Sequence, residues 1–221
     1  MSAEQNTPIL IIGARFDGHA GVVEGIISSS TCFSVFGYID DNTSMHEKTF
    51  KGKKVLGGGN ILEEIYRQGS VKHAIVAFGD NDLREKFIIK LSGIGYEIPN
   101  IIHKSVIIAG DSVIGKGCVL APGSVIMNGC KIGDGVTINT GTTIDHNCIL
   151  EGYDNISPGS HLSGRVHIEK YVFTGTGTII IPDIRVGHHS ILAAGCVVIR
   201  DVPPFDKVAG VPAKSIKKDI G

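Results

Sequence analysis

A histidine flanked by polar residues interrupts an apolar, glycine-rich region of this 221-residue chain, in the stretch Thr142–Leu150, TTIDHNCIL. An imidazole titrates near neutrality, so His146 could act as a general base that takes a proton from an attacking group. Asp145 and Asn147 stand on either side of it, although an amide cannot stabilise an imidazolium as a carboxylate does. A solvated histidine without a chemical role is the alternative that these residues leave open.

Three polar segments follow apolar runs in the first hundred residues. The segment Gly13–Ala20, GARFDGHA, comes before a helix-like stretch, where a glycine-rich turn can hold a phosphate through backbone N–H groups. It lacks the GxGxxG fingerprint of dinucleotide-binding proteins. The segments Asp40–Asn42 and Gly79–Asp82 supply carboxylates that could accept from a ribose hydroxyl or a base N–H. Turn formation and helix capping are the alternative for all three.

The elements that must position these segments alternate between strands and helices. Helical patterns cover residues 22–27, 60–69 and 81–95. The expected strands are Pro8–Ile12, Phe33–Ile39, Lys53–Gly57 and His73–Gly79. This alternation predicts an α/β unit, a small parallel sheet with helices on its faces.

A six-residue period replaces this pattern from Val106 and continues without insertion to Asp201. The third residue is Ile, Leu or Val in fifteen of sixteen hexads, Thr174 being the exception, and the sixth is Gly in eight. Aliphatic residues pointing inward and glycine at tight turns indicate a parallel β-helix in which three hexads form one coil. Residues eighteen apart should then stack, which places Asn128, His146 and Gly164 in one corner column.

Composition narrows the class of protein. The 21 basic and 22 acidic side chains give a net charge of -1, which argues against nucleic acid as the main partner. The first eight residues have no features of a secretory signal, and no apolar stretch reaches 18 residues, so we expect a cytoplasmic protein that does not span a membrane. Four of the five cysteines begin a hexad, which favours packing over disulfides, metal binding or nucleophilic roles.

The hexads and the closing segment GVPAK (210–214) resemble those of the hexapeptide-repeat acyltransferases, whose fold is a left-handed parallel β-helix. From Ile9 to Lys214 the chain is similar to bacterial sugar acyltransferases that place a small Rossmann-like domain before the β-helix. That group includes nucleotide-amino-sugar N-acetyltransferases and sialic acid O-acetyltransferases. The resemblance implies a Rossmann-like nucleotide-sugar-binding domain over residues 1–103 and an acyltransferase domain over 104–221.

The same resemblance implies a homotrimer that moves an acetyl group from acetyl-CoA to the amino group of a nucleotide-linked amino-dideoxy sugar. The reaction would belong to bacterial surface-glycan biosynthesis and would need no metal. His146 would be the general base, but Asn147 stands where relatives usually carry Glu or Asp, and the acid Asp145 precedes the histidine. Asn155 replaces a second histidine of the family and could donate an N–H to the thioester. Two further acyl-CoA contacts are implied, Thr176 and Ala194.

The nucleotide-sugar contacts that the resemblance implies come from the three N-terminal segments. They are Asp17, Gly18, His19, Asp40, Asp41, Asn42, Gly79 and Asp82. The first segment departs from the family pattern G-A-x-G-H by two extra residues around Arg15 and Phe16, and Arg15 could compensate with its charge.

Three other functions compete with this interpretation. An O-acetyltransferase acting on a free sugar such as sialic acid is the nearest. A zinc hydratase of the carbonic-anhydrase type is suggested by His161 and His167, although their six-residue spacing points them outward on successive faces. A non-catalytic binding protein is the third, given Asn147 and Asn155.

Overall fold

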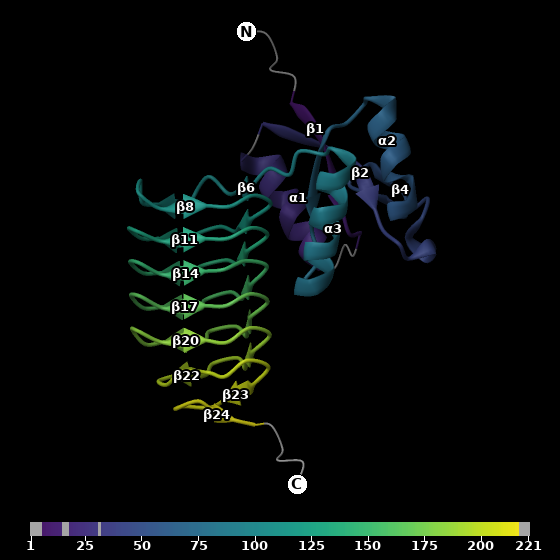
Figure 1. Ribbon diagram of the computed structural model, residues 1–221. Helices are drawn as coiled ribbons and strands as arrows, with labels where there is room; N and C mark the ends of the chain where they lie inside the picture. Colours follow the sequence, from purple (N-terminus) through teal and green to yellow (C-terminus); the bar gives the residue numbers. More distant parts are fainter. Residues whose placement is uncertain (1–5, 15–17, 31, 217–221) are drawn as a thin grey trace. The chain divides into compact units, whose positions relative to one another are not determined.

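The computed structural model describes residues 6–14, 18–30 and 32–216 (Figure 1). The chain divides into two compact units, residues 1–104 and 105–221. No helix within the described ranges has the length and apolar character needed to cross a membrane.

The first unit is built on a five-stranded sheet with the strand order β3-β4-β2-β1-β5. The strands are β1 (Thr7–Ile12), β2 (Phe33–Ile39), β3 (Thr49–Phe50), β4 (Lys53–Gly57) and β5 (His73–Val76). All pair in parallel except β3, which is antiparallel to β4, so the sheet is mixed rather than wholly parallel as expected. The reason is the two-residue link Lys51-Gly52, since only antiparallel neighbours can be joined so tightly, with both residues at positive φ.

Three helices accompany this sheet: α1 (His19–Ser30), α2 (Leu62–Gln68) and α3 (Asn81–Ile94). Two single turns of 3₁₀ helix, η1 (Thr43–Met45) and η2 (Gly59–Ile61), lie in the loops, and the short strand β6 (Ile101–Ile102) follows α3. The Asp80 carboxylate caps α3 by accepting from the Leu83 N–H at 2.8 Å. Glycines in the left-handed conformation, Gly69 and Gly95, end α2 and α3.

The second unit is a parallel β-helix of strands two or three residues long, stacked in three sheets (Figure 1). The first sheet holds β7 (Ile107–Ile108), β10 (Val125–Ile126), β13 (Thr143–Ile144), β16 (His161–Leu162), β19 (Ile179–Ile180) and β22 (Val197–Val198). The second holds β8 (Val113–Ile114), β11 (Lys131–Ile132), β14 (Ile149–Leu150), β17 (His167–Ile168) and β20 (Arg185–Val186). The third holds β9 (Val119–Leu120), β12 (Thr137–Ile138), β15 (Asn155–Ile156), β18 (Phe173–Thr174) and β21 (Ile191–Leu192), and ends with β23 (Lys207–Ala209) and the antiparallel β24 (Lys214–Ser215).

The register of these strands confirms the predicted hexads. Thr143 pairs with Val125 on one side and His161 on the other, so one coil takes eighteen residues. The third residue of nearly every hexad is buried, Thr174 included. Its hydroxyl oxygen accepts from the Ser157 N–H at 3.0 Å, which satisfies a polar group inside the coil.

The last residue of most hexads has a left-handed backbone conformation, whether or not it is glycine. All eight hexad-ending glycines have positive φ, and so do the six other residues Asn147, Tyr153, Arg165, Tyr171, Asp183 and His189. At one corner the rings of Tyr153, Tyr171, His189 and Phe205 form a ladder with centroid spacings of 5.9, 4.5 and 5.0 Å. Stacking of this kind contributes favourable contacts that offset the conformational cost of positive φ.

Candidate active site

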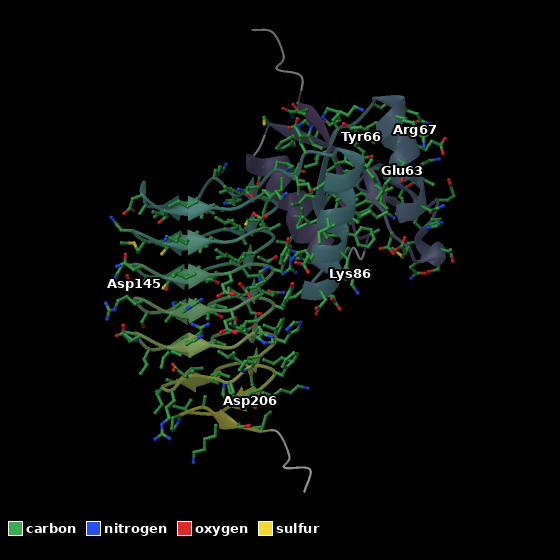
Figure 2. All side chains as sticks on the ribbon, in the orientation of Figure 1. Glu63, Tyr66, Arg67, Lys86, Asp145 and Asp206 are labelled. Carbon is green, nitrogen blue, oxygen red and sulfur yellow. The ribbon has the colours of Figure 1, made fainter. Side chains whose placement is uncertain are left out.

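His146 lies at the corner between β13 and β14, where the chain passes from the first to the second sheet of the β-helix. Ile144 and Cys148 are fully buried on either side, so the coil fixes the backbone of the corner. Figure 2 shows the neighbouring Asp145 projecting from this outer edge of the coils. The histidine is therefore held by a rigid frame but presented outward.

The next coil leaves room for the imidazole because it carries glycine at the stacked position. Backbone hydrogen bonds from Asn147 to Asn128, 2.8 Å, and from Arg165 to His146, 2.9 Å, hold successive coils in the predicted column. A Cβ on Gly164 would lie only 2.5 Å from Nε2 and 2.6 Å from Cε1 of His146. The ring thus lies over Gly164, with Nε2 directed toward the following coils.

The two polar neighbours of His146 play different parts. Asp145 accepts from the backbone N–H of His146 at 2.7 Å, so its carboxylate shapes the corner. The Asn147 side chain reaches the ring itself, with Nδ2 3.2 Å from Nδ1. Because the amide nitrogen faces Nδ1, a neutral imidazole carries its proton on Nε2. A half-turn of the amide exchanges the two atoms and frees the Nε2 lone pair, as a general base requires.

An ion pair beside this corner was not found from the sequence. Arg165 donates to Asp183 through Nε at 2.6 Å and through a terminal nitrogen at 2.8 Å. The hydrogen bonds from Arg165, and more weakly the charges of Arg165 and His146, hold the pKa of the Asp183 carboxyl below its usual value. The signal that could have revealed this pair was its spacing, since Asn147, Arg165 and Asp183 each end a hexad, eighteen residues apart.

The residues expected to contact acyl-CoA lie on other parts of the β-helix. Asn155 belongs to β15 in the third sheet, which does not border the His146 corner. Its amide oxygen accepts from the Asn139 side chain at 3.0 Å, which leaves its NH₂ group available as a donor. Thr176 and Ala194 are exposed and occupy equivalent places on successive coils, linked through the hydrogen bond from Gly195 N–H to the Thr176 carbonyl.

In the first unit, a cavity of about 200 Å³ opens at the carboxyl ends of β1, β2 and β5. Its walls are mainly apolar, with the Phe78 and Phe87 rings meeting edge to face at a centroid distance of 5.5 Å. The lining residues are Ile12, Gly13, Ile39, Asp40, Asp41, Ala77, Phe78, Leu83 and Phe87. Apolar walls with a few polar groups at this end of a parallel sheet are typical of a nucleotide site.

The carboxylates predicted to bind ligand also tie the loops of this cavity together. Asp40 accepts from the backbone N–H groups of Ala14 at 2.7 Å and Asn42 at 2.9 Å. Asp41 accepts from the Gly59 N–H at 2.7 Å. The Asn42 side chain caps η1. The structure thus brings Asp40 and Asp41 to the cavity but uses some of their oxygens to shape it.

His19 begins α1, and its Nε2 atom is buried without a hydrogen-bond partner in the part of the chain that the structure describes. Burial, with a smaller contribution from the charge of Arg84, lowers the pKa of His19 to about 4. The ring is therefore neutral at pH 7. A buried, unsatisfied nitrogen at the start of a helix is a place where a ligand could bind.

The remaining predicted contacts of the first unit are less informative. Gly18, Gly79 and Asp82 are exposed and do not line the cavity. Asp17, together with Arg15 and Phe16, lies outside the described residues. The roles assigned to all these positions stay predictions.

No group of three His, Cys, Asp or Glu side chains suited to a metal ion occurs among the described residues. His161 is hydrogen-bonded to Thr143 at 2.8 Å, and His167 lies 2.8 Å from Glu151. The four cysteines that begin hexads are buried, and Cys130 and Cys148 donate to backbone carbonyls.

Several known proteins resemble this chain. Residues 8–91 match the PglD N-terminal domain. A variant of perosamine N-acetyltransferase from Caulobacter crescentus, solved with CoA and GDP-perosamine, is 33% identical, with 96% of this chain and 97% of that chain covered and a TM-score of 0.89. The acetyltransferase domain of PglB from Neisseria gonorrhoeae is 31% identical, with 96% and 100% covered and a TM-score of 0.88.

Curated relatives match shorter stretches of the chain. One is the 2,3,4,5-tetrahydropyridine-2,6-dicarboxylate N-acetyltransferase of Enterococcus faecalis, 47% identical over 53 residues, which is 24% of this chain and 23% of that protein. The chain thus spans about a quarter of the length of such relatives. The matches along the whole chain decide the family and confirm the predicted left-handed β-helix. The chain belongs to the hexapeptide-repeat sugar N-acetyltransferases in which a PglD N-terminal domain precedes a left-handed β-helix.

Proposed function

We propose that this protein transfers an acetyl group from acetyl-CoA to the amino group of a nucleotide-linked amino sugar, with His146 as general base. The observation that carries this proposal is the outward-facing imidazole over Gly164, in a chain whose full length matches a GDP-perosamine N-acetyltransferase solved with CoA. Both co-substrates are products of the cytoplasm, which is where we place the reaction.

In this reaction the amine nitrogen attacks the thioester carbonyl carbon and forms the C–N bond. His146 takes the proton that the nitrogen loses through Nε2, once Asn147 has turned its amide oxygen toward Nδ1–H. The C–S bond then breaks, and the CoA sulfur leaves with a proton returned from the imidazolium. Holding the two substrates in line supplies much of the remaining acceleration.

The donor side of the site requires a second copy of the chain. Asn155 can donate from its free NH₂ group to the thioester oxygen, where negative charge develops. Within one chain, Asn155 is away from His146, because β15 lies in the sheet that does not border the His146 corner. In a homotrimer of side-by-side β-helices, Asn155 of the partner subunit would instead face His146. Thr176 and Ala194 would contact the pantetheine arm from the same copy as Asn155.

The nucleotide would bind the first unit at the cavity between the ends of β1, β2 and β5. The edge-to-face phenylalanines give a base an apolar wall, and Asp41 can accept from a base N–H or ribose hydroxyl. His19, at the N-terminus of α1, offers its buried Nε2 to a phosphate oxygen if that nitrogen carries the ring proton.

The test is acetyl-CoA consumption with a panel of UDP-, GDP- and dTDP-linked amino sugars, followed by mass spectrometry of the product. We expect one nucleotide series to be N-acetylated and His146→Ala to lose nearly all turnover. Full turnover of His146→Ala would refute the base assignment. Acetylation of free sialic acid, without stabilisation of the protein by any nucleoside diphosphate, would favour O-acetyl transfer instead.

A further inference from the structure

The amide of Asn155 can donate to the thioester only if its nitrogen, and not its oxygen, points away from the coil. The two ends of an amide have nearly the same shape, so a freely solvated asparagine adopts both orientations. A donor for the developing oxyanion contributes most when it is oriented before the reaction begins. Some contact within the coils therefore has to select one end of this amide.

The side chain of Asn139, directly after β12 on the preceding coil, makes that contact. Its amide nitrogen lies 3.0 Å from the Asn155 amide oxygen and 3.0 Å from the Ile156 carbonyl oxygen. An NH₂ group has two hydrogens, so one nitrogen can donate to both oxygens. The backbone N–H of Asn139 also donates to the Ile156 carbonyl, at 2.9 Å, which holds the two coils together at this point.

The Ile156 carbonyl determines the orientation of both amides. A carbonyl oxygen can only accept, so Asn139 must turn its nitrogen toward it, because two amide oxygens at this distance would repel each other. That nitrogen can only donate, so the Asn155 atom beside it must be the oxygen. The Asn155 NH₂ group then faces away from Asn139, and in the described part of the chain it donates to no other residue.

The amide of Asn147 has no such anchor. Within the described residues its side chain makes one hydrogen bond, to Nδ1 of His146, and an imidazole nitrogen can face either end of an amide. The two asparagines of the site therefore differ. Asn147 is able to turn, as general-base catalysis requires, whereas Asn155 is held in one orientation.

We propose that Asn139 is a positioning residue that holds the Asn155 amide with its NH₂ group toward the acetyl-CoA thioester. It thereby sets the direction of the hydrogen-bond donor for the developing oxyanion. This inference rests on the proposed function, because it needs Asn155 to donate to the thioester oxygen.

The experiment reverses the selected orientation with Asn139→Asp and measures steady-state acetyl transfer at pH 7–8, where the carboxyl group is ionised. A carboxylate cannot donate, so Asn155 should turn its NH₂ group toward it and present its oxygen to the thioester. Loss of one oxyanion donor lowers kcat roughly 100- to 1,000-fold, and we expect a loss in that range with KM for acetyl-CoA unchanged. Asn139→Ala frees the Asn155 amide without reversing it and should cost roughly two- to tenfold.

A double-mutant cycle with Asn155→Ala separates positioning from structural damage. Asn155→Ala should lower kcat about as much as Asn139→Asp does. The double variant should lose no more than Asn155→Ala alone, because Asn139 then has no amide to position. Ser112→Ala is the control, since it removes a comparable contact between coils, from the Ser112 hydroxyl to the Met127 carbonyl at 2.7 Å, and should leave kcat unchanged.

If Asn139→Asp fails to fold, the same cycle is measured with Asn139→Ala. Wild-type kcat in the Asn139 variants, or losses that add in the double variant, overturn the inference and leave the proposed acetyl transfer intact. Wild-type kcat in Asn155→Ala overturns the donor role of Asn155 and this inference with it. Absence of acetyl transfer by the wild type with every acceptor overturns the proposed function itself.

Discussion

The substitution Gly164→Ala should move the His146 imidazole and leave the rest of the corner unchanged. A Cβ at this position would stand 2.5 Å from Nε2, and ordinary contact begins at 3.4 Å, so the ring must move by about 0.9 Å (3.4 − 2.5). Gly164 is not among the residues with positive φ, so alanine fits the backbone. The displaced group is a side chain at the surface, which can rotate at little cost.

A displacement of about 1 Å in a catalytic group can reduce the rate roughly 100-fold, equivalent to about 2.7 kcal/mol in the activation barrier. The free energy of unfolding should increase slightly or stay unchanged. Alanine reduces the conformational entropy of the unfolded chain, which contributes about 0.4–1 kcal/mol to folding when the backbone accepts it. Gly164→Ala should therefore be folded, as stable as the wild type, and nearly inactive.

The assay is kcat for acetyl transfer alongside the thermal unfolding midpoint. Gly110→Ala is the matched control, because Gly110 occupies the same corner column and a Cβ there meets nothing within 4 Å. Its kcat should equal that of the wild type. Gly164→Ala with wild-type kcat, or an equal loss in both variants, would show that the ring position seen here is not the one used in catalysis.

Three more expectations concern pH, thiols and the interior of the coils. His19 has its pKa lowered to about 4, so the unfolded chain binds a proton that the folded ring resists. Stability should fall by up to roughly 3 kcal/mol as pH drops from 6.5 to 4, and denaturant titrations should show this slope disappearing in His19→Gln. With Ellman's reagent, the exposed Cys32 alone should react in the native protein and the four buried thiols only after unfolding; rapid reaction of more than one native thiol would contradict the packing. Asp154 is fully buried inside the coil and accepts from the Val172 N–H at 2.9 Å, so Asp154→Ala should cost about 1–3 kcal/mol by denaturant unfolding, and a loss under about 0.5 kcal/mol would be inconsistent with that bond.

Residue types alone predicted part of the candidate site. The sequence identified His146 as an outward corner residue and nominated Asp40 and Asp41, which the structure places at the mouth of one cavity. It did not identify Arg165 and Asp183, because an Arg and an Asp eighteen residues apart look like ordinary surface charges until the coils stack. The orientation of the Asn147 amide was likewise open, since both ends of an amide can face an imidazole.

The fold was determined largely by the sequence, for a physical reason. A period of six with an aliphatic residue at the third place permits one register, because shifting a strand by one residue would turn its buried face outward. The sheet of the first unit was less constrained, and the antiparallel β3 followed from the short link Lys51-Gly52 rather than from any strand pattern. What only the tertiary structure decided is which side chains meet across coils: the imidazole over Gly164, the Arg165–Asp183 pair beside it, and Asn155 on the sheet away from this corner. Periodicity fixes where each backbone position lies, but side-chain torsions and hydrogen-bond partners between coils are set by neighbours that are distant in sequence.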